Sequence, residues 1–261
     1  MNSVSSRTPR FVRIGALLGV AFLALPIVGL LKRVAWSTLC RQLTDVATRD
    51  AMRISLYASV CATVLALVLG LPLAWCLARM QFSGRRFVRA LVLPPVVGGV
   101  ALLGAYGKSN GLLGGLLNSL FGIQLTYSLW GVIIAETFVA LPFLVLSLEG
   151  GLRSIDVKYE ESAAVMGATS FTRFMRVTLP LLKPSLVAGL MLAWARALGE
   201  FGATITFAGN IQGRTQTAPL AVYTMLESNP EGAYALSFLL VAISVGLLVG
   251  LRDRWIGGSS Q

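Results

Sequence analysis

The sequence predicts an all-α integral membrane protein with six transmembrane helices. Hydrophobic residues make up 56% of the 261 residues and charged residues only 13%, whereas soluble domains carry about 25% charged residues. The mean hydropathy is +0.76, and the apolar residues gather in long runs without charge. A soluble fold of this length could not bury so much apolar surface, so these runs are expected to lie in a bilayer.

Four uncharged runs are long enough to cross the hydrocarbon core, which needs roughly 18 to 20 helical residues. They span residues 14–31, 54–78, 90–107 and 232–251. Two further spans are predicted at 127–148, which contains Glu136, and at 184–207, which contains Arg196 and Glu200. The whole chain, residues 1–261, is therefore predicted to be one transmembrane domain.

The first apolar run could also be a secretory signal peptide, because Arg7, Arg10 and Arg13 form a basic region before it. It is longer than the usual apolar core of a signal peptide, and no A-x-A cleavage site precedes Lys32 and Arg33. The sequence therefore favours an uncleaved first helix.

The Lys and Arg residues indicate the orientation, because cytoplasmic loops of membrane proteins carry an excess of them. With both termini in the cytoplasm, fourteen of the 22 Lys and Arg residues face inward. The loop 79–89 contains four arginines and no acid, which favours an inside position, although five bases between Lys32 and Arg53 crowd the first external loop. The net charge of +11 thus reports topology and requires no nucleic-acid partner.

Missing residue types exclude several classes of chemistry. The sequence has no histidine, which removes imidazole metal sites and histidine acid–base catalysis. Its three cysteines are odd in number and argue against a disulfide framework. The run Gly107–Ser109 resembles the end of a phosphate-binding P-loop, but Leu102 stands where that motif requires a glycine. No nucleotide or metal site is therefore predicted for this chain.

A polar and basic segment, residues 156–180, separates the fourth and fifth spans and is predicted to be a cytoplasmic helical hairpin. Good helix formers run from residue 159 to residue 166, and Gly167 can adopt the left-handed conformation that ends a helix. Thr169 or Ser170 can cap a second helix. Such a segment could be a solvated linker, or a rigid knob that a cytoplasmic partner binds.

The spacing within this segment resembles the EAA loop of ABC importer permeases. The residues that carry the resemblance are Glu160, Glu161, Ser162, Ala163, Gly167, Val177, Leu179 and Pro180. Ser162 stands where the family has its first alanine, so a small residue is retained. The resemblance implies the type I, MetI-like permease fold, and a coupling hairpin that docks in a groove on a separate ATP-hydrolysing subunit.

The same resemblance implies the rest of the assembly. Two copies of this chain are expected to form the membrane-spanning part, with two ATPase subunits inside and a periplasmic or lipid-anchored oxyanion-binding protein outside. ATP and Mg²⁺ belong to the ATPase subunits in this family, so this chain is expected to hold no cofactor and to be no enzyme. The expected location is a bacterial-type inner cell membrane, with both termini cytoplasmic.

The segment Ala195–Tyr223, ARALGEFGATITFAGNIQGRTQTAPLAVY, resembles molybdate-type oxyanion permeases. The implied function is ATP-driven import of molybdate, with tungstate inseparable from it. The residues predicted to line or gate the route are Pro94, Gly98, Gly99, Arg196, Glu200, Thr204 and Asn210.

Arg196 follows Lys183 by thirteen residues, which places it about 20 Å into a helical span. A charge at that depth has to be paired or to line a water-filled route. Glu200 is four residues on and can pair with it, so both a structural ion pair and a lining for the anion stay open. Gly98 and Gly99 likewise fit a bendable gate helix or a kinked packing helix.

Two other functions remain alternatives. Sulfate and thiosulfate permeases share a looser form of the same segment. A secondary transporter driven by an ion gradient would instead use the intramembrane charges as ion sites. An intramembrane enzyme is disfavoured, because the sequence offers no plausible pair of nucleophile and base.

Overall fold

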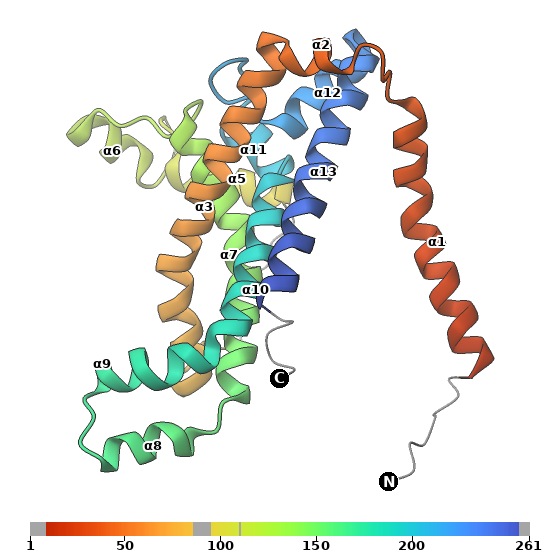
Figure 1. Cartoon of the computed structure of the whole chain (residues 1–261). Helices are drawn as coiled ribbons and strands as arrows, with labels where there is room; N and C mark the ends of the chain where they lie inside the picture. The colour runs from red at the N-terminus through yellow and green to blue at the C-terminus, as the bar shows by residue number, and fades with distance from the viewer. Residues whose placement is uncertain (1–8, 86–94, 110, 256–261) are drawn as a thin grey trace.

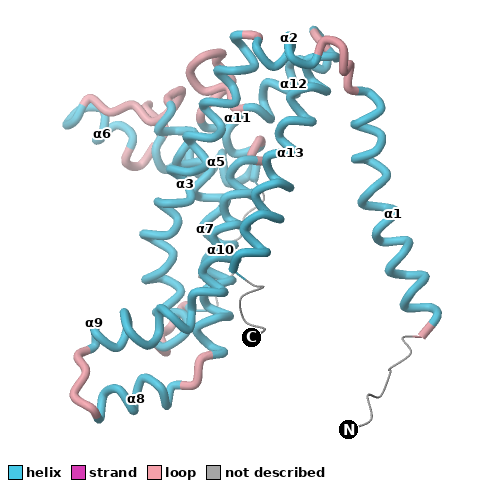
Figure 2. Tube along the Cα trace, viewed as in Figure 1, coloured by secondary structure: helices cyan, strands magenta, loops and turns pink. Residues whose placement is uncertain are grey.

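The computed structural model describes residues 9–85, 95–109 and 111–255, and every regular element in these ranges is a helix (Figures 1 and 2). Five helical stretches are long and apolar enough to cross a membrane. They are α1 (Arg10–Arg33), α3 (Val46–Arg79), α7 (Leu129–Ser154), Ser170–Leu198 and the start of α13 (Pro230–Trp255). A sixth apolar helix, α5 (Pro95–Tyr106), has 12 residues. The all-α membrane class is therefore confirmed, with five described helices of spanning length where six were predicted.

Shorter helices connect or flank these spans. They are α2 (Leu39–Thr44), α6 (Gly114–Phe121), α8 (Val157–Val165), α9 (Ser170–Arg173), the π-helical turn η1 (Phe174–Thr178), α11 (Gly202–Phe207) and α12 (Ala218–Ser228). The stretch Ser170–Leu198 consists of α9, η1 and α10 (Leu179–Leu198). In Figure 1, α8 and α9 lie at the lower end of the molecule, α2 and α12 lie at the upper end, and α6 projects to one side.

Several predicted span limits change in the structure. Helices α1, α3 and α13 extend at both ends beyond the uncharged runs 14–31, 54–78 and 232–251, because a helix can continue past the hydrocarbon into charged residues. Helix α7 begins at Leu129 rather than at residue 127, since the Ser128 side chain accepts the N–H of Gly131 at 3.1 Å and caps it. The predicted third span, 90–107, begins outside the described residues and ends at Tyr106.

The predicted fifth span, 184–207, is wrong as one continuous helix. Helix α10 begins at Leu179 and ends at Leu198, and the short helix α11 follows after residues 199–201, which we call the break. The carboxylate of Glu200 accepts the backbone N–H of Ala203 at 2.7 Å. A side chain that satisfies a free N–H at a helix start lets a new helix begin there, and hydropathy alone does not reveal this.

Helix α7 is the centre of the packed body. In its most apolar 18-residue segment, 61% of the residues are buried, against 33% in α3 and 22% in the stretch that contains α10. Helix α7 packs on both of these helices. Small residues allow the close approach: a Cβ placed on Gly70 of α3 would lie 3.1 Å from Leu141, and one on Gly189 of α10 would lie 3.0 Å from Ser147. The core is thus a three-helix contact built on one central helix.

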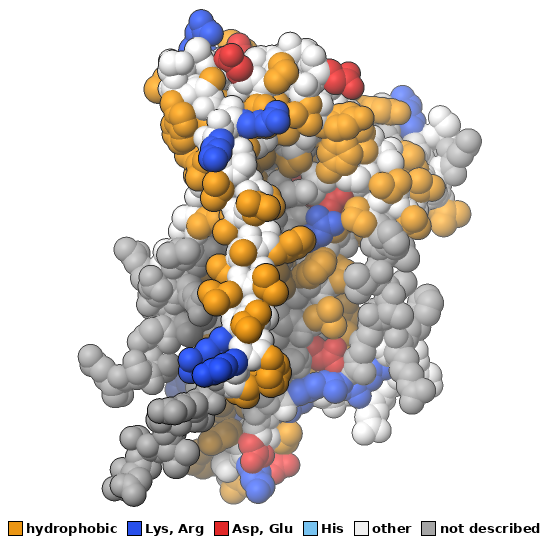
Figure 3. Space-filling model, turned by 90° about the vertical axis from the view of Figure 1, so that its right-hand side faces the viewer, with side chains coloured by type: hydrophobic (Ala, Val, Ile, Leu, Met, Phe, Trp, Pro, Cys, Tyr) orange, Lys and Arg blue, Asp and Glu red, His pale blue; other side chains and the backbone are white. Residues whose placement is uncertain are grey.

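Helix α1 stands apart from this body along most of its length (Figure 1). None of its residues is buried, and Arg33 at its end donates a hydrogen bond to the Tyr234 hydroxyl of α13 at 3.0 Å. Figure 3 looks onto this side and shows hydrophobic side chains along α1, with Lys and Arg side chains near the two ends of this helix. Such a helix is suited to a lipid environment.

Candidate functional site

The hairpin, residues 156–178, has the helix–break–helix form that its sequence predicts. Helix α8 runs over Val157–Val165, close to the predicted 159–166, and the Asp156 side chain caps it by accepting the N–H of Lys158 at 3.0 Å. Gly167 has a φ of 84°, and the N–H of Ala168 reaches the carbonyl of Ala163 at 3.0 Å. This is the left-handed helix end for which glycine is favoured.

The second arm of the hairpin is also helical. Thr169 caps α9 by accepting the N–H of Thr172 at 3.3 Å, which confirms the predicted cap. Helix α9 continues through η1 into α10. Leu179 is the first residue of α10, and Pro180 lies in the first turn of α10. Pro180 has no N–H to donate, and the π-helical turn directly before it, where the Leu179 N–H reaches the carbonyl of Phe174, is the place where the hydrogen-bond ladder shifts. The hairpin is therefore joined to a membrane helix without a flexible linker.

Glu160 fixes the hairpin to the membrane body. Its carboxylate forms an ion pair with Arg79, the last residue of α3, at 2.8 Å between Nη2 and Oε1. The Thr178 hydroxyl donates to the same oxygen at 3.2 Å. Both charged side chains are largely buried, at 16% and 14% exposure. A partly buried, hydrogen-bonded ion pair holds its two elements more firmly than an exposed one, so α8 and α3 are tied together.

The remaining residues of the EAA-like pattern differ in solvent exposure. Ala163 is buried, Val177 and Leu179 are half-buried, and Glu161, Ser162 and Pro180 are exposed. The turn of the hairpin also exposes large apolar side chains: Val165 is 90% exposed, Met166 80% and Phe171 71%. An exposed apolar group at the tip of a charged hairpin is typical of a protein-binding surface.

Sequence reasoning missed two residues of this anchor. Arg79 counts in the sequence only as one of four arginines that set topology, and Thr178 carries no signal of its own. Their link to Glu160 depends on the folded arrangement of three helices. The one sequence signal is an acid in the EAA-like pattern together with a base at the end of a span that is predicted to be cytoplasmic.

A second site lies at the break between α10 and α11. Arg196 and Glu200 form an ion pair at 2.6 Å between Nη1 and Oε2, and the other carboxylate oxygen accepts the N–H of Ala203 at 2.7 Å. The Glu200 side chain is 1% exposed and the Arg196 side chain 25%. The Arg196 guanidinium also lies 6.0 Å from the centre of the Phe143 ring on α7. The pairing predicted from the sequence is confirmed, and it coincides with a backbone break.

Other predicted route residues lie around this break. Thr204 of α11 is fully buried, and within the described part of the chain neither its hydroxyl nor the Oδ1 of half-buried Asn210 has a hydrogen-bond partner. Glu136 of α7 was not among the predicted route residues. It is 1% exposed, its Oε2 has no hydrogen-bond partner among the described residues, and it interacts electrostatically with Glu200. Buried polar atoms without protein partners are rare in packed cores and favour contact with water or a ligand.

Gly98 and Gly99 of α5 have a packing reason. A Cβ on Gly98 would lie 2.8 Å from the Phe138 ring of α7, and a Cβ on Gly99 would collide with the Thr206 side chain of α11. Both glycines are buried, so α5 sits tightly between α7 and α11. This closeness, rather than a bend, is what the structure shows for them. Pro94 lies outside the described residues.

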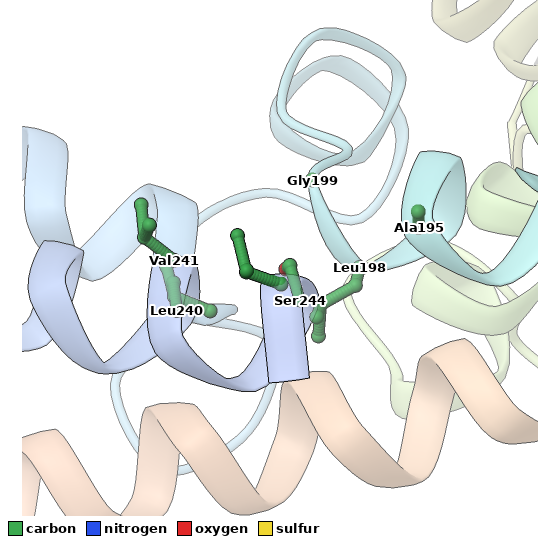
Figure 4. A pocket seen from close by; sticks show the side chains of 7 residues that line it. Ala195, Leu198, Gly199, Leu240, Val241 and Ser244 are labelled. Carbon is green, nitrogen blue, oxygen red and sulfur yellow. The ribbon is translucent and has the colours of Figure 1, made fainter. Parts of the chain in front are cut away.

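An open apolar hollow of about 220 Å³ adjoins the break (Figure 4). Its lining residues are Ala195, Leu198 and Gly199 from the end of α10 and Leu240, Val241, Ser244 and Val245 from α13. Among the described residues, no group of three or more His, Cys, Asp or Glu side chains has a metal-binding arrangement. The polar groups that the described residues bring to the break include the Arg196 guanidinium, the carboxyl groups of Glu200 and Glu136, and uncharged oxygens.

The chain as a whole is similar to known membrane transport proteins. The model of the family described as binding-protein-dependent transport system inner membrane component matches residues 51–257. The molybdenum transport system permease protein of Mycobacterium tuberculosis is 44% identical over 251 residues, which cover 94% of each chain. The corresponding protein of Haemophilus influenzae is 39% identical and covers 81% of this chain and 94% of its own.

Two further similarities are more distant. The sulfate transport system permease protein of Escherichia coli K12 is 34% identical over 239 residues, covering 88% of this chain and 86% of its own. A chain of a bacterial alginate ABC transporter, solved in complex with an alginate-bound periplasmic protein, superimposes with a TM-score of 0.74. At 17% identity, covering 94% of this chain and 93% of that one, this similarity shows the shared fold alone.

Proposed function

This chain belongs to the family of inner membrane components of binding-protein-dependent transport systems, and we propose that it is the permease subunit of an ATP-driven molybdate importer. The observation that carries the proposal is the 44% identity to a molybdenum permease over 94% of both chains. Because the chain belongs to this family, we no longer favour the alternative of a secondary transporter driven by an ion gradient.

Sulfate is the second candidate substrate, because a sulfate permease is 34% identical over 88% of this chain. Molybdate, tungstate and sulfate are all tetrahedral dianions, so a few side chains along the route are enough to change the preference. The greater identity and coverage favour molybdate, with tungstate as its closest mimic.

The partners follow from the coupling hairpin and the family. The hairpin docks on a soluble ATPase subunit that binds ATP and Mg²⁺, and its exposed Val165, Met166 and Phe171 form the contact. Two copies of this chain and two ATPase subunits make the transporter, and an oxyanion-binding protein delivers the substrate from outside. This chain itself catalyses no reaction and holds no cofactor.

The hairpin end of the molecule faces the cytoplasm in this proposal. The Arg10 end of α1 lies toward the same end as α8 and α9 (Figure 1), in keeping with cytoplasmic termini and a basic inner side. Single cysteines at Ser83 and Ser119, in a chain whose Cys40, Cys61 and Cys76 are replaced, test this orientation. A membrane-impermeant maleimide added to intact cells should label position 119 and spare position 83. The reverse labelling would overturn the orientation.

Uptake by the reconstituted transporter tests the substrate. The chain is assembled with its ATPase subunit in proteoliposomes, and labelled molybdate is supplied with the oxyanion-binding protein. We expect ATP-dependent uptake that unlabelled molybdate and tungstate suppress strongly and sulfate suppresses weakly. Stronger competition by sulfate than by tungstate would assign the chain to sulfate transport instead.

A further inference from the structure

The ion pair at the break has the form of an occupied anion site. We propose that Glu200 is an internal anion that holds Arg196 in the resting permease, and that the transported oxyanion replaces the Glu200 carboxylate on Arg196 as it passes. This inference rests on the proposed function and adds to it a mechanism at one residue pair. Arg196 is the group that contacts the anion, and Glu200 is the group that is displaced.

The exposures of the two side chains differ in the direction that this exchange requires. The Glu200 side chain is 1% exposed and the Arg196 side chain 25%, so part of the arginine side chain stays accessible while its partner is enclosed. A cation deep in a span does not face hydrocarbon, because such positions face the protein interior or a water-filled cavity. The accessible part of Arg196 is therefore open to a polar route.

The chemistry of Arg196 suits a tetrahedral oxyanion. A guanidinium presents five N–H donors in a planar fork that matches the paired oxygens of a carboxylate or phosphate. Apart from the Phe143 ring, Glu200 is the one partner that the described residues provide for this guanidinium. Glu200 meets this fork with a single oxygen, Oε2, at 2.6 Å. An anion with two oxygens on one edge can take its place and use two donors of the fork in charge-assisted hydrogen bonds.

The position of Glu200 connects this exchange to movement of the helices. It lies in the break, and its second oxygen accepts the Ala203 N–H at the start of α11. The apolar hollow beside the end of α10 gives Leu198 and Gly199 space toward α13 (Figure 4). A shift of the end of α10 can therefore separate Arg196 from Glu200 without compressing the core around α7.

Exchange also explains why the cation carries an internal partner. A permanently free guanidinium in a low-dielectric site would attract an anion strongly and release it slowly, whereas conduction requires binding that is weak enough to leave. Glu200 competes with the anion at the same donors. The anion is thus returned to the route when the carboxylate comes back.

Binding of labelled molybdate to the purified permease–ATPase complex, without the oxyanion-binding protein, tests the proposal. Glu200→Gln keeps an amide oxygen for the Ala203 N–H but removes the competing charge. We expect this variant to bind molybdate at least about tenfold more tightly than the wild type, the change that follows from removing one charge-assisted contact. The double variant Arg196→Gln with Glu200→Gln should lose that gain and gives the background binding.

Each outcome decides the question. Equal binding by the wild type and Glu200→Gln, or an equal gain in the double variant, would overturn the exchange. If Glu200→Gln does not assemble, Glu200→Asp is measured, because its shorter carboxylate cannot keep both contacts; it should gain less than tenfold, and no gain would count against the proposal. Uptake of molybdate by the wild-type transporter is measured beside these variants. If the wild type does not take up molybdate, the proposed substrate is wrong, and the result does not bear on the exchange.

Discussion

The hairpin and the break are opposite in chemistry. The hairpin lies outside the membrane helices and exposes large apolar side chains, with Val165 90% and Met166 80% exposed. The break lies within the helical body and buries charged and polar side chains, with Glu200 at 1% and Thr204 at 0% exposure. Each region therefore places its side chains in the environment that its chemistry disfavours.

The contrast shows where this chain depends on something outside itself. Exposed apolar surface is stabilised when a protein partner covers it, and buried charge is stabilised when another charge or a ligand meets it. Between these two regions, α3, α7 and α10 bury mainly alanine and leucine against one another. Departures from local consistency mark functional regions more often than structural ones.

The largest effect is expected from breaking the charge balance at the break. Arg196→Met should cost about 3–5 kcal/mol in stability, because it leaves the buried Glu200 carboxylate without its counter-ion. Adding Glu200→Gln should restore most of this loss while keeping the acceptor for Ala203. Thermal unfolding of the purified complex measures both variants.

Transport separates the two interpretations of that pair. If Arg196 contacts the anion, the stable double variant should import molybdate poorly per folded complex. Near-normal uptake by the Arg196→Met, Glu200→Gln variant would reduce the pair to a structural one.

A change at the turn of the hairpin should affect coupling and spare the membrane helices. Gly167→Val forces a β-branched residue to a φ of 84°, with a strain of about 1–3 kcal/mol. A Cβ there meets nothing within 4 Å, so the effect comes from the backbone alone. We expect normal insertion and loss of most ATP-dependent uptake, measured together with ATP hydrolysis. Gly167→Ala, which has the smaller side chain, should be milder; normal coupling in the valine variant would remove the hairpin from the mechanism.

The packing of α5 on α11 should respond to a single methyl group. Gly99→Ala places that group against Thr206 and the backbone of Ala203, and overpacking of this kind costs about 1–3 kcal/mol. Gly104→Ala in the same helix meets nothing within 4 Å and serves as the matched control. Unfolding temperatures that fall only for Gly99→Ala are the expected result. Equal temperatures for both would mean that α5 adjusts freely.

The smallest effect is expected at the anchor of the hairpin. Glu160→Gln removes the charge that pairs with Arg79 but keeps an acceptor for Thr178, and should cost about 1 kcal/mol. The neighbouring Glu161 is exposed, so Glu161→Gln is the control and should leave stability unchanged. Protease accessibility of the hairpin measures the loosening. Equal protection of both variants would show that the ion pair does not hold the hairpin in place.

The hairpin was largely predictable because its signals are local. A glycine that ends a helix, a threonine that caps the next and a proline in a first turn act through neighbouring residues, and Gly167, Thr169 and Pro180 occupy those positions in the structure. The pairing of Arg196 with Glu200 was also predictable from a spacing of four residues, and the pair forms even though Glu200 lies just past the end of α10.

By itself, the sequence determined the membrane class, the approximate spans, the hairpin and the ion pair, because hydropathy, helix-end signals and helical spacing act over one or two turns. Only the tertiary structure decided that the span 184–207 breaks after Leu198, that Arg79 and Thr178 hold Glu160, and that Gly98 and Gly99 serve close packing. Those features join residues from different helices. Their partners are set by how α3, α5, α7, α10 and α11 pack, a choice that no local pattern records.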